Sequence, residues 1–370
     1  MMTTRMIYVH IPFCDSKCYY CDFVSAKYSD DIKREYFQSL KKEIKKYSSS
    51  QTKISSIFIG GGTPSSVDVS YICEIINTIK QNFDVQKDAE ITIEANPCSV
   101  DKTKLLAYKK SGINRISFGV QSFDDELLKT IGRRHSSSQA KNAINLAQQV
   151  GFDNINADLL LGLPGQTYNS LELSVNELLS LPVTHISAYM LINEEGTVLT
   201  KKIEKGELQT PTEEDCVLWY DKMLELLQKN GFERYEVSNF AKSGYECKHN
   251  LGYWQTKQYY GVGLSAHGYI DGIRYSNTTN IKKYISGGFV ENTEKLTSRE
   301  KIEEKLFLGL RTKYGVNINE LKKLGCDITK NDNLKSLMDG GFVRIDENIA
   351  ICDDKFAVMD SIVLKLLEKI

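Results

Sequence analysis

The chain has 370 residues, a formal net charge of −1 and nine cysteines. The length predicts two domains, or one large α/β domain with an appendage. Hydrophobic residues make up 41%, enough for a sizeable core, and the near-neutral charge argues against a nucleic-acid partner. No apolar run of about 18 residues would span a membrane. The first ten residues lack the apolar stretch of a signal peptide, so we expect a cytoplasmic protein with reduced cysteines.

The first half of the chain alternates between two kinds of segment. Six short runs are rich in β-branched or aromatic residues: Met6–His10, Ser56–Gly60, Glu90–Ala95, Arg115–Gly119, Asn156–Leu161 and His185–Leu191. Amphipathic stretches lie between them: Tyr36–Ile44, Val69–Ile79, Gln139–Val150 and Leu171–Leu181. This alternation predicts βαβ units and a parallel sheet. Periodicity alone does not distinguish an open doubly wound sheet from a partial barrel.

The second half has a different pattern. Residues 234–297 are aromatic, glycine-rich and irregular, and we expect them to connect the core (1–233) to a last domain (298–370). In that domain three helical stretches precede two short strand-like runs: Ser298–Leu310, Asn319–Leu324, Asn333–Gly340, Phe342–Ile345 and Ile349–Ile351. Three helices and a hairpin predict a small winged-helix-like α+β domain.

Three cysteines follow the first predicted strand with the spacing C-x3-C-x2-C: Cys14, Cys18 and Cys21. Three thiolates on one loop can hold three irons of a [4Fe–4S] cluster and leave the fourth iron open to a ligand. A zinc site with Asp22 or His10 as the fourth ligand is the alternative. The cysteine spacing alone leaves both interpretations open.

The residues around these cysteines resemble the signature of a known protein family. The run from His10 to Cys21, His-Ile-Pro-Phe-Cys-x3-Cys-x-Tyr-Cys, resembles the signature of radical S-adenosylmethionine (SAM) proteins. Its His-Ile-Pro-Phe lead-in is similar to that of the oxygen-independent coproporphyrinogen III oxidase group. The resemblance implies a partial (β/α)6 barrel with the cluster at its mouth, SAM chelating the open iron, and cleavage of SAM by one electron from the cluster.

The same resemblance implies a set of SAM-binding residues. A Gly-rich loop can present backbone N–H groups to a ligand, and buried carboxylate, amide and guanidinium groups can hold its polar atoms. The positions carried over are Tyr8, Gly61, Gly62, Thr63, Glu94, Gln121, Arg133 and Asp158. His10, beside the cluster, is the candidate catalytic residue.

Two features separate subgroups of this family. Decarboxylases of the group carry an additional cysteine where this chain has Phe23, and a long N-terminal segment, whereas only seven residues precede Tyr8 here. The segment H-N-x-x-Y-W resembles a motif of heme chaperones in the group, in which histidine can ligate iron and aromatic rings can face a macrocycle. Its residues are His249, Asn250, Tyr253 and Trp254. Without the resemblance, an aromatic-rich structural turn is the alternative.

The resemblance therefore predicts a heme chaperone that binds a [4Fe–4S] cluster, SAM and heme, and delivers heme to apo-hemoproteins. The competing hypothesis is an oxygen-independent coproporphyrinogen III oxidase. A homodimer is expected from the resemblance alone. Neither a nucleic-acid partner nor a membrane-spanning segment is expected.

Overall fold

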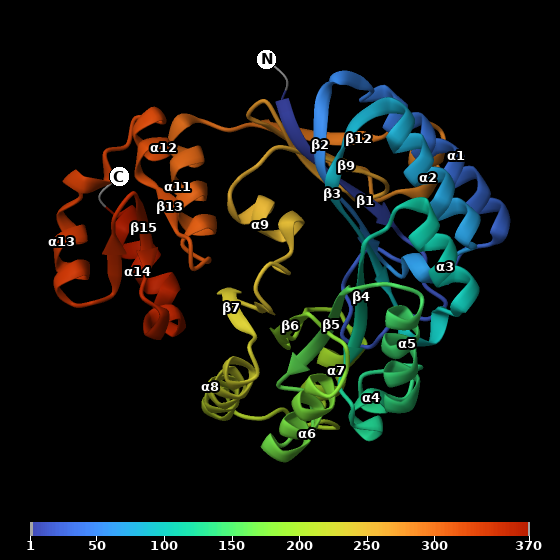
Figure 1. Ribbon diagram of the computed structural model, residues 1–370, viewed down its shortest axis with the longest axis horizontal. Helices are drawn as coiled ribbons and strands as arrows, with labels where there is room; N and C mark the ends of the chain where they lie inside the picture. Colours follow the sequence, from blue (N-terminus) through green and yellow to red (C-terminus); the bar gives the residue numbers. More distant parts are fainter. Residues whose placement is uncertain (1–2, 369–370) are drawn as a thin grey trace.

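The computed structural model describes residues 3–368. Six parallel strands in sequence order form the core: β1 (Thr3–Ile11), β2 (Ser49–Gly61), β3 (Phe83–Ala95), β4 (Arg115–Gln121), β5 (Asn154–Leu161) and β6 (His185–Met190). Helices follow the strands and cover the outside of the curved sheet (Figure 1). This arrangement confirms the predicted partial (β/α)6 barrel. None of the helices within residues 3–368 combines the length and apolar character needed to cross a membrane.

The covering helices bury one apolar face each. They are α1 (Asp30–Lys46), α2 (Val69–Asn82), α3 (Lys102–Ser111), α4 (Asp125–Thr130), α5 (Ser137–Gln149), α6 (Tyr168–Leu179), α7 (Val198–Glu204) and α8 (Glu213–Lys229). In α1, the Ser29 side chain caps the first turn, and Phe37, Leu40 and Ile44 are buried. Each such side chain contributes about 1.5–3 kcal/mol by burial. Two short 3-10 turns, η1 (Pro64–Ser66) and η2 (Pro97–Ser99), follow β2 and β3.

Residues 234–297 differ from the irregular connection that we expected. They form most of β7 (Glu233–Glu236) and all of β8 (Asn239–Ala241), α9 (Lys248–Trp254), β9 (Tyr259–Val262), β10 (His267–Ile270), β11 (Ile273–Asn277), α10 (Ile281–Ile285) and β12 (Val290–Lys295). These strands extend the barrel sheet to 12 strands, with β9 parallel to β1 and β8 antiparallel to β6. Strands of three to six residues are too short to give a periodic pattern, which is why the prediction was wrong here.

The C-terminal part has its own hydrophobic core and a three-stranded antiparallel sheet. Its elements are α11 (Ser298–Gly309), β13 (Val316–Asn317), α12 (Ile318–Lys323), η3 (Ile328–Lys330), α13 (Asp332–Asp339), β14 (Val343–Ile345), β15 (Asn348–Ile351), η4 (Asp353–Val358) and α14 (Met359–Leu367). Backbone hydrogen bonds join it to the barrel, from Val237 N to Arg311 O (3.1 Å) and from Lys313 N to Tyr235 O (3.0 Å).

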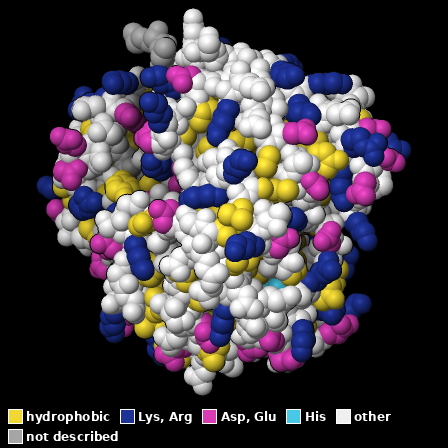
Figure 2. All heavy atoms as spheres, turned by 45° about the vertical axis from the view of Figure 1, so that its right-hand side comes forward, with side chains coloured by type: hydrophobic (Ala, Val, Ile, Leu, Met, Phe, Trp, Pro, Cys, Tyr) yellow, Lys and Arg dark blue, Asp and Glu magenta, His cyan; other side chains and the backbone are white. Residues whose placement is uncertain are grey.

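The surface charge agrees with the composition. On the face shown in Figure 2, Lys and Arg side chains are interspersed with Asp and Glu. That face therefore presents no extended field of one sign of the kind that grips a nucleic-acid backbone.

Candidate functional site

A cavity with a volume of about 430 Å³ lies inside the barrel, next to the cysteine loop. Its lining residues come from the loops after β1 and β2, from the inward-facing positions of β3 to β6, and from α9. The structure brings ten of the predicted cluster and SAM residues to this one cavity: Cys14, Cys18, Cys21, Gly61, Gly62, Thr63, Glu94, Gln121, Arg133 and Asp158.

The cysteine loop presents three half-buried free thiols to the cavity. Arg133 Nη1 donates to Cys18 Sγ at 3.4 Å, and burial raises the pKa of Cys21. Within residues 3–368, no three His, Cys, Asp or Glu side chains lie close enough to hold a single metal ion. Three thiols on one loop with a neighbouring cation fit an anionic [4Fe–4S] cluster, which would supply the electron for SAM cleavage when bound.

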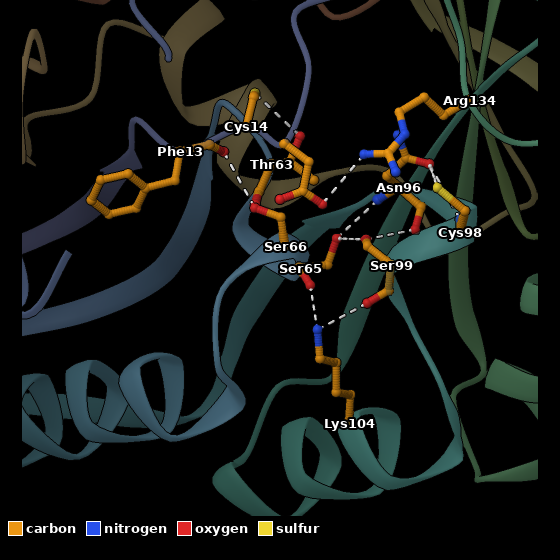
Figure 3. Close-up of polar contacts among 11 residues, drawn as sticks. Phe13, Cys14, Thr63, Ser65, Ser66, Asn96, Cys98, Ser99, Lys104 and Arg134 are labelled. Atoms are coloured by element: carbon orange, nitrogen blue, oxygen red, sulfur yellow. Dashed lines mark hydrogen bonds and ion pairs between the residues drawn. The ribbon is translucent and has the colours of Figure 1, made fainter. Parts of the chain in front are cut away.

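The Gly-rich loop after β2 is pressed against the cysteine loop. A Cβ at Gly62 would lie 3.0 Å from Cys14 Sγ and 2.8 Å from Phe13 O. Gly61 has φ of 112°, and its Cβ would lie 2.6 Å from the His10 ring. Thr63 N donates to Phe13 O at 2.8 Å, and Thr63 Oγ1 lies 3.4 Å from Cys14 Sγ (Figure 3). Only glycine allows this close approach, which leaves room for a ligand beside the loop.

A polar network fixes this loop to the next one. Asn96 N donates to Ser65 Oγ at 2.9 Å, and Ser65 Oγ hydrogen-bonds Ser99 Oγ. Lys104 Nζ donates to Ser65 O (2.7 Å) and to Ser99 O (3.1 Å) (Figure 3). The loops after β2 and β3 therefore hold their positions without a ligand, which preorganises the rim of the cavity.

Two half-buried carboxyl groups face the cavity. Burial and the nearby Asp158 raise the pKa of Glu94 to about 8, and burial also raises the pKa of Asp158. Glu94 accepts a hydrogen bond from Gly61 N (3.1 Å), and Asp158 accepts one from Asn156 Nδ2 (2.7 Å). Two half-buried acids that line one cavity favour a ligand that brings positive charge, as the sulfonium and amino groups of SAM do.

Gln121 ends β4, and Arg133 lies in the turn that follows α4. Gln121 has φ of 70°, which is uncommon for a residue with a side chain and is typical of functional positions. Arg133 Nη2 donates to Gly119 O, while its buried Nε has no hydrogen-bond partner in the described part of the chain. Such an orphaned donor fits a polar ligand in the cavity.

Tyr8 and His10 lie behind the cavity wall, and neither lines the cavity. His10 Nδ1 is 3.0 Å from Tyr8 Oη, and its Nε2 is 3.1 Å from Val24 O, beyond the last cluster cysteine. Burial lowers the pKa of His10. In this packing His10 contacts the cysteine loop and does not line the cavity, and the catalytic role expected for it stays a prediction. The Tyr8 hydroxyl is directed at His10, and the SAM contact expected for Tyr8 stays a prediction as well.

The prediction missed several polar residues that also line the cavity: Arg115, Ser117, Asn156, Ser187 and Tyr189. A signal for them existed in the sequence. Polar residues recur at every second position of β4, β5 and β6 within otherwise apolar runs. Because alternate side chains of a strand share one face, this pattern indicates a polar barrel interior.

The H-N-x-x-Y-W segment forms α9, which packs between β2 and α11 (Figure 1). His249 is only 1% exposed. Its Nδ1 is 2.9 Å from Ser56 Oγ and its Nε2 is 3.1 Å from Tyr253 Oη. Glu90 accepts hydrogen bonds from Lys248 N and His249 N, both at 3.0 Å, and so satisfies donors at the start of α9. Within α9, His249 and Gly252 are buried, while Tyr253 and Trp254 are half-buried.

The four motif residues therefore do not share one face. Asn250 lines the barrel cavity, whereas Trp254 lines a different cavity against the C-terminal domain. His249 and Tyr253 line neither cavity and hydrogen-bond each other. In the observed packing, both nitrogens of His249 are engaged, so no lone pair points at a ligand.

Comparison with known proteins agrees with this site. Residues 8–178 match the radical SAM superfamily. The chain is 41% identical to the heme chaperone HemW of Bacillus subtilis over 85% of each protein, and 38% identical to HemW of Lactococcus lactis over 87% of this chain and 86% of that protein. The solved structure of coproporphyrinogen III oxidase (HemN) from Escherichia coli superimposes with a TM-score of 0.85 at 22% identity, covering 99% of this chain and 90% of that one.

Proposed function

Because the chain belongs to the radical SAM superfamily and, within it, to the HemW heme chaperones, we propose that it binds heme and delivers it to apo-hemoproteins. The similarity to HemW proteins over 85% of the chain is the observation that carries this proposal. The barrel cavity supports it, since it retains the cysteine loop and the polar lining that a cluster-bearing member of the superfamily needs.

The proposal includes two cofactors. Cys14, Cys18 and Cys21 would hold the [4Fe–4S] cluster, and the rest of the lining would hold SAM against the open iron. Glu94 and Asp158 would face the cationic parts of SAM, while Gly62 would allow close approach beside Cys14. The role of the chain's own residues in this state is to bind and orient SAM and to keep water away from it.

Heme binding by the α9 motif belongs to the same proposal. Iron ligation by His249 requires that the ring leave Ser56 and Tyr253, because both nitrogens are engaged in the ligand-free packing. Trp254 and Asn250 need no such movement, since each already lines a cavity. The motif can therefore contribute to heme binding with or without a direct bond from His249 to iron.

The alternative function is oxidative decarboxylation of coproporphyrinogen III. The likeness to the HemN structure at 22% identity supports the shared fold and goes no further. Phe23 argues against decarboxylation, since it stands where those enzymes carry an additional cysteine. Its side chain is 62% exposed at the edge of the cavity.

Two assays on the anaerobically reconstituted protein test the proposal. One incubates it with SAM, a reductant and coproporphyrinogen III, and the other titrates it with heme. We expect saturable heme binding and no turnover to a vinyl product. Repeated turnover of coproporphyrinogen III would overturn the chaperone assignment, as would failure of the folded, cluster-loaded protein to bind heme.

A further inference from the structure

A second cavity, with a volume of about 840 Å³, lies between the end of α9 and the C-terminal domain. We call it the interdomain cleft. It shares no residue with the barrel cavity. One wall is the end of α9 and the turn after it, and the other is built from α11, β13 and α12. Six of its lining residues are charged or aromatic: Trp254, Lys257, Lys305, Tyr314, Glu320 and Lys323.

The cleft carries an excess of positive charge. Three lysines face one glutamate, which leaves two positive charges uncompensated. Lys305 Nζ pairs with Glu320 Oε2 at 2.7 Å and donates to Thr256 Oγ1 at 3.2 Å, so it ties the two walls together. Lys257 and Lys323 form no ion pair with any residue in the range 3–368. Two free ammonium groups in one cleft complement a ligand with two carboxylates.

The cleft also carries aromatic groups. Trp254 and Tyr314 both line it, so the two rings offer apolar surface to a ligand in the cleft. Thr256, in the same wall, has φ of 55°, an outlier for a β-branched residue.

We infer that the interdomain cleft binds a tetrapyrrole dicarboxylate, with its ring against Trp254 and Tyr314 and its two propionates paired with Lys257 and Lys323. This inference rests on the proposed function and gives the C-terminal domain a share in the heme site. A flat apolar macrocycle with two carboxylates matches both the aromatic groups and the charge of the cleft.

Among residues 3–368, the lining of the cleft contains no His, Cys or Met side chain. The macrocycle is therefore held through its ring and its propionates, and a strong bond to iron is not required. This mode of binding suits a protein that must release its ligand. This mode of binding also predicts that a metal-free porphyrin binds about as well as heme does.

Titration of the full-length, cluster-loaded protein with heme and with metal-free protoporphyrin IX tests the inference. We expect the two affinities to agree within about threefold. The double variant Lys257→Glu/Lys323→Glu is expected to weaken both by about tenfold or more, since it turns two attractive contacts into repulsive ones. Lys322→Glu is the matched control, because Lys322 lies on the same helix outside the cleft. Trp254→Phe should retain most of the affinity and Trp254→Ala should lose it.

The outcomes separate this inference from the proposed function. If the wild-type protein binds heme but not metal-free porphyrin, iron ligation decides binding, and the cleft assignment fails while the chaperone function stands. If it binds neither, the proposed function fails as well. Unchanged affinity in the double charge-reversal variant, with the cluster absorbance intact, would also overturn the cleft assignment.

Discussion

At the scale of single residues, the barrel cavity is lined by carboxyl groups whose burial without a positively charged partner costs free energy. Glu94 and Asp158 sit together half-buried in the cavity wall, so the pKa of each is raised, that of Glu94 to about 8. Below that pH Glu94 is mostly neutral, and above it Glu94 is mostly a carboxylate. A cationic ligand is attracted only to the carboxylate, so its binding is linked to release of a proton.

SAM affinity should therefore depend on pH. For the cluster-loaded protein we expect tighter SAM binding as the pH rises from about 6.5 to about 8.5, because more of Glu94 is ionised. Equilibrium dialysis across this range measures the effect. Glu94→Gln should bind SAM more weakly and show a flatter pH dependence, whereas the exposed Glu35→Gln serves as the control. Wild-type affinity and pH dependence in Glu94→Gln would contradict the role assigned to this carboxyl group.

The glycine loop gives a second test at this scale. Gly61→Ala should destabilise the protein by about 2–4 kcal/mol, because it adds a Cβ at positive φ and places it against the His10 ring. Gly196→Ala is the matched control, since Gly196 has φ of 81° and nothing within 4 Å of an added Cβ, and it should cost only about 1–2 kcal/mol. Urea unfolding compares the two. An equal loss of unfolding free energy in the two variants would show that the contact with the His10 ring adds nothing to the cost of Gly61→Ala.

At the scale of elements, α9 closes the barrel from inside. Its start is held by Glu90, and His249 joins it to β2 through Ser56. Burial, with a contribution from Arg115, lowers the pKa of His249 to about 3, so the ring stays neutral in any working buffer. The helix that resembles a heme motif thus packs against the barrel through these polar contacts and a small apolar cluster that includes Leu251 and Phe58.

His249→Ala is accordingly expected to reduce the free energy of unfolding by about 2–4 kcal/mol, since it removes a buried ring with two hydrogen-bond partners. Asn250→Ala, one residue along on the same helix, should cost clearly less because its side chain faces the cavity. Urea unfolding of the two variants gives the comparison. If both unfold like the wild-type protein, α9 does not stabilise the barrel in the way described.

Sequence patterns predicted the elements that are long and periodic. The six parallel strands and four of the covering helices, α1, α2, α5 and α6, were visible because each buries one face over many residues. The cysteine and glycine loops could be placed because strand ends fix them. The strands between residues 233 and 295 were not predicted, since three to six residues carry no usable period, whereas the hairpin formed by β14 and β15 was. The burial of His249 was not predicted either, because its partner Ser56 is 193 residues away.

At the scale of the whole molecule, two hydrophobic cores coexist, one in the barrel and one in the C-terminal domain. Several contacts connect them, including the backbone bonds of Val237 and Lys313, the ion pairs Arg274–Glu304 and Lys313–Glu233, and the Lys305 clamp across the interdomain cleft. Because the apolar cores themselves are separate, we expect a ligand that touches only the barrel to protect the barrel core more than the C-terminal core.

Ligand-dependent unfolding should reveal this division. SAM at about 100 times its Kd should stabilise the barrel by about 2.7 kcal/mol and leave the unfolding of the C-terminal domain unchanged. Porphyrin, which contacts both walls of the cleft, should stabilise both. Hydrogen exchange resolved along the chain measures the two regions independently. Equal protection of both regions by SAM would contradict two separately responding cores.

The most direct test of the central claim is heme transfer. The anaerobically reconstituted protein, loaded with one equivalent of heme and freed of excess, is mixed with an apo-hemoprotein while the absorption spectrum of the acceptor is followed. We predict that the acceptor gains heme in amounts that match the loss from the donor, with the cluster left intact. A folded, heme-loaded protein that retains its heme in the presence of a competent acceptor would contradict the assignment as a heme chaperone.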